Sequence, residues 1–304
     1  MYRIAILGSE NSHADIFLKY IYGEKKTEEG NYVTVSERAV DDVEVVGVYS
    51  DEKDAMQRQH DVFGVPMMNS FDELVGKVDG IVITARHGDN HFKYAKPYIA
   101  SGIPMFVDKP VTISEKEAVE FMALLKENKV KVSGGSVCGL MDTVKRYKGI
   151  VEKKELGAVL GGSVRAPMDS LAVYGGFFFY SQHLVQMMCE IFGYYPKSVT
   201  AVKHDKHYNC FFNYDGFDVS GTYVNNNYRY YAGIDCENGS EHAVCDLTGD
   251  NFLEEFMTYC NILRGGEMQQ SYEDFFAPVF ILNAVVRSIE SGKCERVLSA
   301  QEIK

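Results

Sequence analysis

The tripeptide Asp108–Pro110, DKP, is the strongest local sign of chemistry in the sequence. It follows an apolar run at Pro104–Val107, which we count as the fifth strand of a parallel sheet. A lysine at the carboxyl end of such a strand points into the ligand crevice, and the following proline fixes the backbone that presents it. There the ammonium group of Lys109 can polarise a carbonyl or stabilise a developing alkoxide during hydride transfer. A lysine at a strand end is also commonly just solvated, so Lys109 needs support from other residues.

The segment Tyr174–His183, YGGFFFYSQH, is a second candidate because it joins a glycine pair and an aromatic cluster to a histidine. A glycine pair lets the backbone approach a ligand closely. We predict a helix that begins near His183, and a histidine at a helix start can act as an acid or base near neutral pH. The alternatives are that the aromatic side chains belong to the core and that the histidine is structural.

The segment Arg3–Ala14, RIAILGSENSHA, has the pattern of a strand, a turn and a helix. A dinucleotide site places GxGxxG at such a turn, so that the backbone and the helix amides can approach the pyrophosphate. Only Gly8 of the three glycines is present, because Glu10 and His13 stand where the other two would lie. Asn11 and Ser12 can cap the helix, so a simple capped turn is the alternative interpretation.

The end of the second strand bears on the choice of dinucleotide. This position normally supplies an acidic residue for the ribose hydroxyls of NAD, and the chain offers Ser50 followed by Asp51. Ser50 would leave room for the 2′-phosphate of NADP, whereas Asp51 would oppose it. The sequence leaves NAD and NADP both open.

Two other groups of residues invite a functional interpretation that we do not adopt. His204 and His207 lack a third ligand at a suitable spacing, so we predict surface residues and no metal site. The tyrosine-rich stretch Tyr223–Tyr231 could line a polyol pocket, although cross-strand packing explains the same pattern. The seven cysteines are odd in number and contain no CxxC pair, which is typical of reduced thiols in a cytoplasm.

The first half of the chain alternates strands and helices, which predicts a doubly wound, Rossmann-type parallel sheet with helices on both faces. We expect strands at residues 3–7, 43–49, 80–84, 104–107 and 130–133, and helices at 12–22, 52–62, 92–100 and 114–127. The charged stretch Gly23–Asp42 interrupts this pattern, and we expect a surface excursion without an assigned function. Ligands on such a sheet bind at the carboxyl ends of the strands.

After about Val137 the pattern changes to an α+β domain with a mostly antiparallel, open sheet. The expected strands are 198–203, 217–225, 230–235 and 242–246, and the expected helices are 143–153, 183–192, 252–264 and 278–291. We therefore place a dinucleotide-binding domain at residues 1–137 and a substrate-binding and oligomerisation domain at residues 138–304. The second sheet is rich in Tyr and Val on a face that needs covering, which favours a homo-oligomer, a dimer or a tetramer.

Length and charge limit the classes of function. A chain of 304 residues exceeds one ordinary core, and its net charge of -12 argues against nucleic acid as a partner. No apolar run approaches the length of a membrane helix, and the start of the chain carries no visible secretion signal, so we expect a cytoplasmic protein without a membrane partner.

The chain resembles the Gfo/Idh/MocA family of oxidoreductases, named for glucose–fructose oxidoreductase and inositol dehydrogenase. The resemblance covers nearly the whole chain and rests on the order and spacing of its landmarks. These are the turn at Gly8, FGVP at Phe63–Pro66, His91, DKP in place of the family's EKP, ELG at Glu155–Gly157, and the glycine pair followed by His183.

The resemblance implies that a hydroxyl of a sugar, polyol or cyclitol is oxidised, or the keto group reduced, with NAD or NADP as cofactor. Lys109 and His183 would then be catalytic, and Tyr174, Tyr180 and His183 would bind the substrate. The residues implied for the cofactor are Gly8, Glu10, Asn11, Ser12, Ser50, Asp51, Arg86, His87, His91, Asp108 and Lys109.

The sequence departs from the family pattern at Glu10 with His13, at Ser50, at Arg86 with His87 in place of Thr-Pro, and at Phe179. Phe179 stands where the family has an aspartate four residues before its histidine, so half of the usual acid/base pair is replaced. Tyr180 or another residue would supply the lost polar contact if the dehydrogenase chemistry is kept. The alternatives are NAD-assisted, redox-neutral glycoside cleavage or epimerisation, and a non-catalytic protein that senses a dinucleotide or a sugar.

Overall fold

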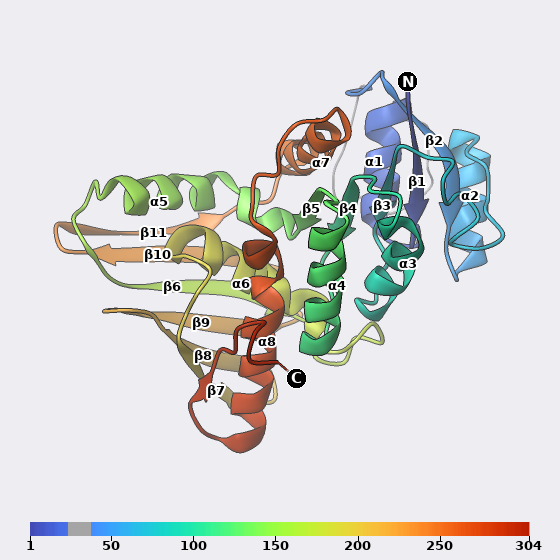
Figure 1. Ribbon diagram of the computed structural model, residues 1–304. Coiled ribbons are helices and arrows are strands. Elements are labelled where there is room, and N and C mark those ends of the chain that lie inside the picture. The colour runs from blue at the N-terminus through green and yellow to red at the C-terminus, as the bar shows by residue number, and fades with distance from the viewer. Residues whose placement is uncertain (24–37, 304) are drawn as a thin grey trace. The chain divides into compact units, whose positions relative to one another are not determined.

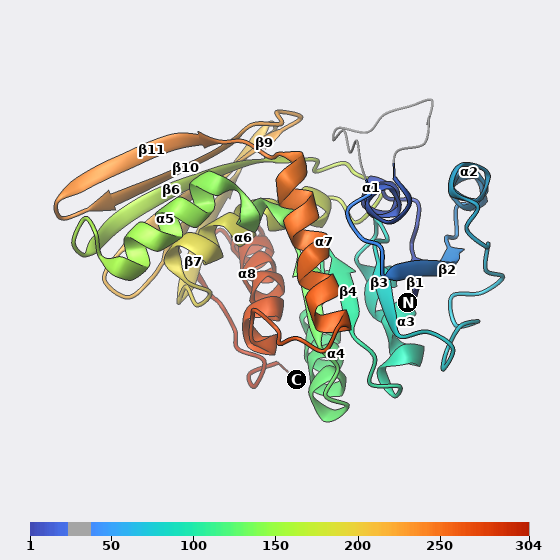
Figure 2. The same cartoon turned by 90° about the horizontal axis from the view of Figure 1, so that it is seen from above.

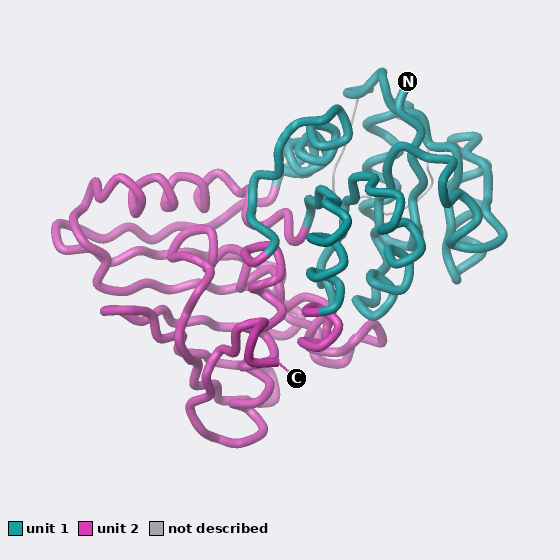
Figure 3. Tube along the Cα trace, in the orientation of Figure 1, with its two compact units in different colours: residues 1–112, 120–134, 248–272 teal, residues 113–119, 135–247, 273–304 magenta. Residues whose placement is uncertain are grey.

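The computed structural model describes residues 1–23 and 38–303, and the chain forms two compact units (Figure 3). The first unit contains residues 1–112, 120–134 and 248–272, and the second contains residues 113–119, 135–247 and 273–304. Residues 113–119 belong to the second unit, and after residue 134 the chain stays in the second unit until residues 248–272 return to the first. Most of the predicted excursion at Gly23–Asp42 lies outside the described residues.

The first unit is built on a five-stranded sheet with the order β2-β1-β3-β4-β5 (Figure 1). Its strands are β1 (Tyr2–Leu7), β2 (Val43–Tyr49), β3 (Gly80–Ile83), β4 (Met105–Asp108) and β5 (Val132–Gly135). β1 pairs in parallel with both β2 and β3, and the chain crosses over β1 between these two strands. The carboxyl ends of β1 and β3 therefore form the switch point where such sheets bind ligands.

The helices of the first unit cover both faces of this sheet. They are α1 (Ser12–Tyr22), α2 (Lys53–Phe63), α3 (Asp89–Ile99), α7 (Gly249–Leu263) and the later turns of α4 (Glu115–Glu127). Phe106 of β4 packs edge-on against Phe17 of α1 and against Tyr259 of α7, so α1 and α7 share one face. Figure 2 shows α3 on the other face.

DKP follows β4, which is the fourth strand of the sheet and also the fourth strand-like run of the sequence, so numbering that run as the fifth strand was wrong. Between α2 and β3 the chain makes only an isolated parallel bridge, from Val48 to Met67. FGVP at Phe63–Pro66 leads into that bridge and not into a full strand.

The second unit contains a seven-stranded sheet with the order β11-β10-β6-β9-β8-β7-β12. Its strands are β6 (Val159–Met168), β7 (Ser198–Lys203), β8 (His207–Asn213), β9 (Asp218–Asn225), β10 (Tyr230–Cys236), β11 (Gly239–Cys245) and β12 (Glu295–Arg296). Only β6 and β9 pair in parallel; the other neighbours are antiparallel. The predicted fold class is therefore confirmed, although β6 and β8 were missed.

Helices cover one face of this sheet, as Figures 1 and 2 show. They are the short η1 (Val137–Leu140), α5 (Asp142–Lys153), α6 (Phe178–Phe192) and α8 (Tyr272–Ser291), of which only Tyr272 belongs to the first unit. The opposite face carries exposed apolar side chains from five strands, namely Leu160, Val202, Phe211, Tyr231 and Val244.

Candidate active site

Gly8 holds three loops together at the carboxyl edge of the first sheet. The N–H groups of Gly8 and Ser9 both donate to the carbonyl of Tyr49, at 2.8 and 3.0 Å, and the Thr84 hydroxyl donates to the Gly8 carbonyl at 3.1 Å. Gly8 has φ +77°, and a Cβ there would lie 2.3 Å from the backbone nitrogen of Ala85. Only glycine fits this turn, which brings the ends of β1, β2 and β3 into contact.

The carboxylate of Glu10 is held by the ends of two neighbouring strands. It accepts hydrogen bonds from the Ser50 hydroxyl at 2.7 Å and from the N–H of Arg86 at 3.0 Å. The first turn of α1 is capped instead by Asn11, whose side-chain oxygen accepts from the N–H of His13 at 3.2 Å. Glu10 is thus bound to the loops after β2 and β3, while Asn11 serves the helix terminus.

Asp51 lies beside two tyrosines that engage both of its oxygens. The hydroxyl of Tyr49 donates to Oδ1 at 2.7 Å, and the hydroxyl of Tyr94 donates to Oδ2 at 3.0 Å. The hydrogen bond from Tyr49 is the main cause that holds the pKa of Asp51 below its usual value. In return, burial and the bond to Asp51 raise the pKa of Tyr49 to about 12.

Asp108 anchors the backbone of the DKP segment through its buried carboxylate. It is completely buried, accepts from the Asn11 amide at 3.0 Å, and lies 2.9 Å from Nδ1 of His13. Its other oxygen accepts the backbone N–H of Lys109 at 2.7 Å. Burial alone raises the pKa of a carboxyl, but His13 and Lys109 outweigh it, so the pKa of Asp108 is lowered. An ionised, buried Asp108 therefore fixes the backbone that presents Lys109.

Glu255 of α7 is a second buried carboxyl that interacts electrostatically with Asp108 and Lys109, and no sequence motif marks it. The residue is 3% exposed, and its Oε2 has no hydrogen-bond partner. Burial raises the pKa of Glu255 well above its usual value, the charge of Asp108 adds to this effect, and Lys109 opposes it. Glu255 is accordingly shifted toward its neutral form, within the electrostatic range of Lys109.

The remaining residues predicted for the cofactor lie around the same edge. His91 is fully buried with Nε2 2.8 Å from the carbonyl of Ala85, and burial lowers the pKa of its ring. A neutral, buried His91 supports the loop after β3. His87, by contrast, lies near the surface and accepts the N–H of Asp89 at 3.3 Å. The Ser12 hydroxyl lies 3.4 Å from the capping oxygen of Asn11.

In the second unit, Nδ1 of His183 lies 2.7 Å from the Ser136 hydroxyl and 3.4 Å from the sulfur of Cys138. Ser136 also caps η1, because its oxygen accepts the N–H of Cys138 at 3.2 Å. The Ser136 hydroxyl can donate to Nδ1 or accept from it, so it can hold the His183 ring in either tautomer. Neither Ser136 nor Cys138 stands out in the sequence, because each is more than forty residues from His183.

One expectation about His183 was wrong, since α6 begins at Phe178 and His183 lies in its second turn. The aromatic residues that we expected before the helix form its first turn, because nothing in their side chains opposes helical dihedrals. Tyr180 lies one turn before His183, with ring centroids 5.5 Å apart. Phe179 packs on Tyr174 and Tyr180, with its ring centroid 5.3 Å from that of Tyr174 and 4.8 Å from that of Tyr180.

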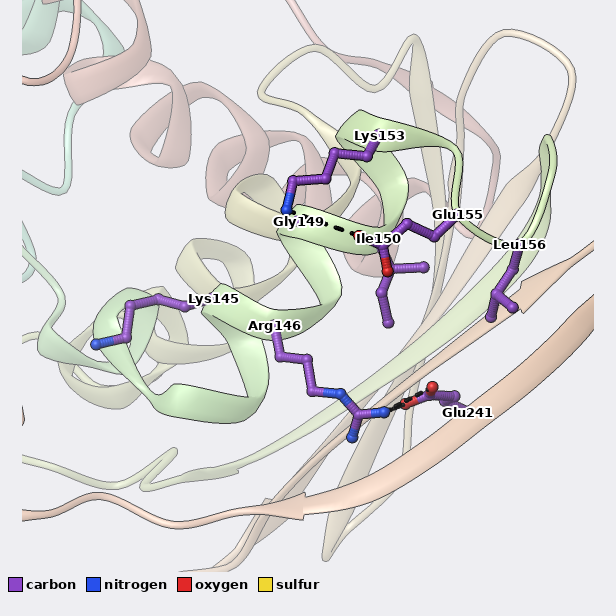
Figure 4. A pocket seen from close by; sticks show the side chains of 8 residues that line it. All are labelled: Lys145, Arg146, Gly149, Ile150, Lys153, Glu155, Leu156 and Glu241. Atoms are coloured by element: carbon purple, nitrogen blue, oxygen red, sulfur yellow. Dashed lines mark hydrogen bonds and ion pairs between the residues drawn. The ribbon is translucent and has the colours of Figure 1, made fainter.

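A hollow with a strongly charged lining lies elsewhere in the second unit (Figure 4). This cavity of about 310 Å³ lies between α5 and β11 and is lined by Lys145, Arg146, Gly149, Ile150, Lys153, Glu155, Leu156 and Glu241. Arg146 forms an ion pair with Glu241, and Lys153 lies 3.7 Å from Glu155. None of the predicted site residues lines it, and its cations are already neutralised.

The described residues also bear on other classes of site. Across residues 1–23 and 38–303, no group of three His, Cys, Asp or Glu side chains is placed to hold a metal ion. No helix in the described part of the chain is both long enough and apolar enough to cross a membrane. All seven cysteines are free thiols.

Residues 3–136 match the sequence model of the Gfo/Idh/MocA group, an oxidoreductase family with an NAD-binding Rossmann fold. No curated protein sequence matches the chain.

Solved structures of inositol dehydrogenases share the fold over nearly the whole chain. A myo-inositol dehydrogenase from Corynebacterium glutamicum ATCC 13032 is 16% identical, with a TM-score of 0.80 over 98% of this chain and 99% of its own. The myo-inositol 2-dehydrogenase of Lactobacillus plantarum is 14% identical, with the same TM-score and coverage. The scyllo-inositol dehydrogenase of Lactobacillus casei, which was solved with NAD(H) and scyllo-inositol, has the same identity, TM-score and coverage. At these identities the likeness concerns the fold.

Proposed function

We propose, from the premise that residues 3–136 match the Gfo/Idh/MocA family of NAD-binding oxidoreductases, that this chain interconverts a hydroxyl and a keto group on a sugar, polyol or cyclitol. The inositol dehydrogenases that share its fold support a cyclitol-like substrate. The observation that carries the proposal is the bond between Ser136 and His183, because it orients an acid/base group although Phe179 replaces the family's aspartate.

The residues at the edge of the first sheet fit a dinucleotide. The turn at Gly8 leads directly into α1, so the positive end of that helix faces the crevice at the switch point. We propose that the Gly8 turn, with Asn11 and Ser12, holds the pyrophosphate and that Glu10, Ser50 and Asp51 face the adenosine ribose. The bound cofactor would supply the hydride acceptor or donor at its nicotinamide.

Lys109 is proposed to contact the oxygen of the reacting carbon. Its backbone is fixed by the ionised Asp108, so its ammonium group is presented in one direction. A positive charge there stabilises the alkoxide character that develops when hydride leaves or arrives.

His183 is proposed as the acid/base group. For reduction, the protonated ring donates through Nδ1 to the Ser136 oxygen and gives its Nε2 proton to the carbonyl oxygen, which leaves a neutral imidazole. In the direction of oxidation, the neutral ring starts in the tautomer in which Nδ1 donates to the Ser136 oxygen. Its unprotonated Nε2 then accepts the proton of the substrate hydroxyl. Ser136 can serve both tautomers because a hydroxyl is both donor and acceptor.

Calorimetric titration with NAD(H) and NADP(H), followed by turnover of a polyol and sugar panel, tests this function. Lys109→Ala should lower kcat by about 100-fold or more. The matched control is Lys96→Ala, since Lys96 is an exposed α3 lysine paired with Glu120. Wild-type rates in Lys109→Ala contradict the proposal.

Two results of the same assay would point to the other functions. Turnover without net absorbance change at the nicotinamide band favours redox-neutral cleavage or epimerisation. Binding of a dinucleotide and a sugar without any turnover favours a sensing protein.

We also propose that the protein is a homo-oligomer. The outer face of the second unit's sheet exposes Phe211 by 53% and Leu160 by 61%, and Tyr231 and Val244 are neighbours across β10 and β11. Exposed apolar side chains on a sheet face are commonly covered, and a second copy offers the same face in return.

A further inference from the structure

We infer that Glu10 makes the cofactor site select NAD(H) over NADP(H). The inference rests on the proposed function, since it concerns the dinucleotide site of that enzyme. It assigns to the loop between β1 and α1 a task that parallel dinucleotide-binding sheets usually give to the end of the second strand.

The end of β2 lacks an acid at its first position, and Glu10 reaches that place from the neighbouring loop. β2 ends at Tyr49, and the next residue, Ser50, donates its hydroxyl proton to Oε2 of Glu10 at 2.7 Å. Ser50 is 2% exposed, so this bond is sheltered from water. The carboxylate therefore lies at the end of β2, although the sequence places it forty positions earlier.

Glu10 keeps acceptor capacity for a ligand. A carboxylate has about four lone-pair sites. The Ser50 hydroxyl uses one site on Oε2, and the N–H of Arg86 uses one on Oε1 at 3.0 Å. Each oxygen thus retains a site for a ribose hydroxyl, which is a donor. A 2′-phosphate offers only acceptors and negative charge near neutral pH, so it meets repulsion at the same place.

The other carboxylate at this strand end, Asp51, is a weaker determinant. Its side chain is 57% exposed, and both oxygens already accept from tyrosine hydroxyls. Glu10 is 9% exposed, so its charge is screened less by water and salt. The difference in burial assigns the selection to Glu10.

The experiment measures dissociation constants of NADH and NADPH by calorimetry for the wild type and for Glu10→Gln. Glutamine keeps the size and an acceptor oxygen but removes the charge. We expect the NADPH-to-NADH ratio of dissociation constants to fall by about tenfold or more in Glu10→Gln, mainly through tighter NADPH binding. The effect should shrink as salt is raised from 0.05 to about 0.5 M.

Three further variants sharpen the test. Ser50→Ala leaves the charge but removes the bond that holds it, so it should shift the ratio in the same direction by a smaller factor. Asp51→Asn should shift it by less than about threefold. Asp54→Asn is the matched control, because it removes an exposed carboxylate from α2 in the same unit. Thermal unfolding followed by circular dichroism confirms that each variant is folded.

The outcomes separate this inference from the function on which it rests. If the wild type binds neither dinucleotide, the proposed function fails and the inference with it. If the wild type binds NADH and the ratio is unchanged in Glu10→Gln, the function stands and only the role of Glu10 is overturned. A larger shift in Asp51→Asn than in Glu10→Gln also overturns it.

Discussion

Ser136 is the residue on which the proposed proton transfer depends most directly, because its hydroxyl lies 2.7 Å from Nδ1 of His183 and orients the ring. Ser136→Ala should lower kcat/KM by roughly 10- to 100-fold, since the ring loses the partner that fixes its orientation. Ser181→Ala is the matched control. Ser181 is also buried on α6, and its hydroxyl has no partner. Steady-state kinetics checks both variants. Equal losses of kcat/KM would show that Ser136→Ala acts through packing and not through its bond to His183.

The buried carboxyl of Glu255 should be visible in the pH dependence of stability. Burial and Asp108 raise its pKa well above the ordinary value of 4.5 in the folded protein. As pH rises, the unfolded chain therefore loses this proton before the folded protein does. The stability that the bound proton contributes is complete below pH 4.5 and is lost as pH rises toward the pKa of Glu255 in the folded protein. Glu255→Gln removes this loss and should stabilise the protein at pH 7.5 by about 1 kcal/mol or more.

Urea unfolding of the wild type and Glu255→Gln at pH 5 and pH 7.5 makes the measurement. The advantage of the variant should be larger at pH 7.5. An advantage that is equal at both pH values would mean that Glu255 is not neutral in the folded protein.

At the residue scale, the sequence predicted the residues that carry a local motif. DKP and the histidine after the glycine pair pointed to Lys109 and His183, whose catalytic roles stay predictions. Ser136 and Glu255 escaped because their meaning comes from contacts over long sequence distances. Glu10 was noticed as a departure from a glycine motif, but its bond to Ser50 depends on how two loops meet.

Among the elements, the turn between β1 and α1 is the most sensitive to substitution. Gly8→Ala combines a strained positive φ with a clash against the backbone of Ala85. Gly64→Ala is the matched control, because Gly64 has φ +73° and open space around it. Gly64→Ala should lower the free energy of unfolding by about 1–2 kcal/mol, and Gly8→Ala should lower it by at least about 2 kcal/mol more. Equal losses of unfolding free energy in urea would mean that the backbone at Ala85 moves readily enough to relieve the clash.

The strands of the first sheet were predictable because continuous apolar runs are typical of strands buried on both faces. In the second sheet, β6 was missed since its sequence, VLGGSVRAPM, contains two glycines and a proline that obscure the alternation. β8, HYNCFFN, alternates in burial, but polar residues at its start resemble a loop. The early start of α6 was missed because a glycine pair suggested a longer turn.

For the whole molecule, the apolar outer face of the second sheet predicts self-association. The wild type should have a mass above the 34.2 kDa of one chain in light scattering coupled to size exclusion. Phe211→Glu should shift it toward the monomer at micromolar concentration, because it places a charge in the proposed contact. Met67→Glu is the control, since Met67 is an exposed apolar residue of the first unit. A monomeric wild type contradicts the proposal.

The return of α7 to the first unit also sets the order in which the protein can be completed on the ribosome. Residues 1–134 emerge without α7, so the faces of Phe17 and Phe106 that α7 covers stay open. At about 5–20 residues per second, α7 follows roughly ten seconds later, after nearly all of the second unit. A nascent chain released early would thus expose its aromatic core to chaperones, and the NAD-binding half matures only once the other half is nearly made.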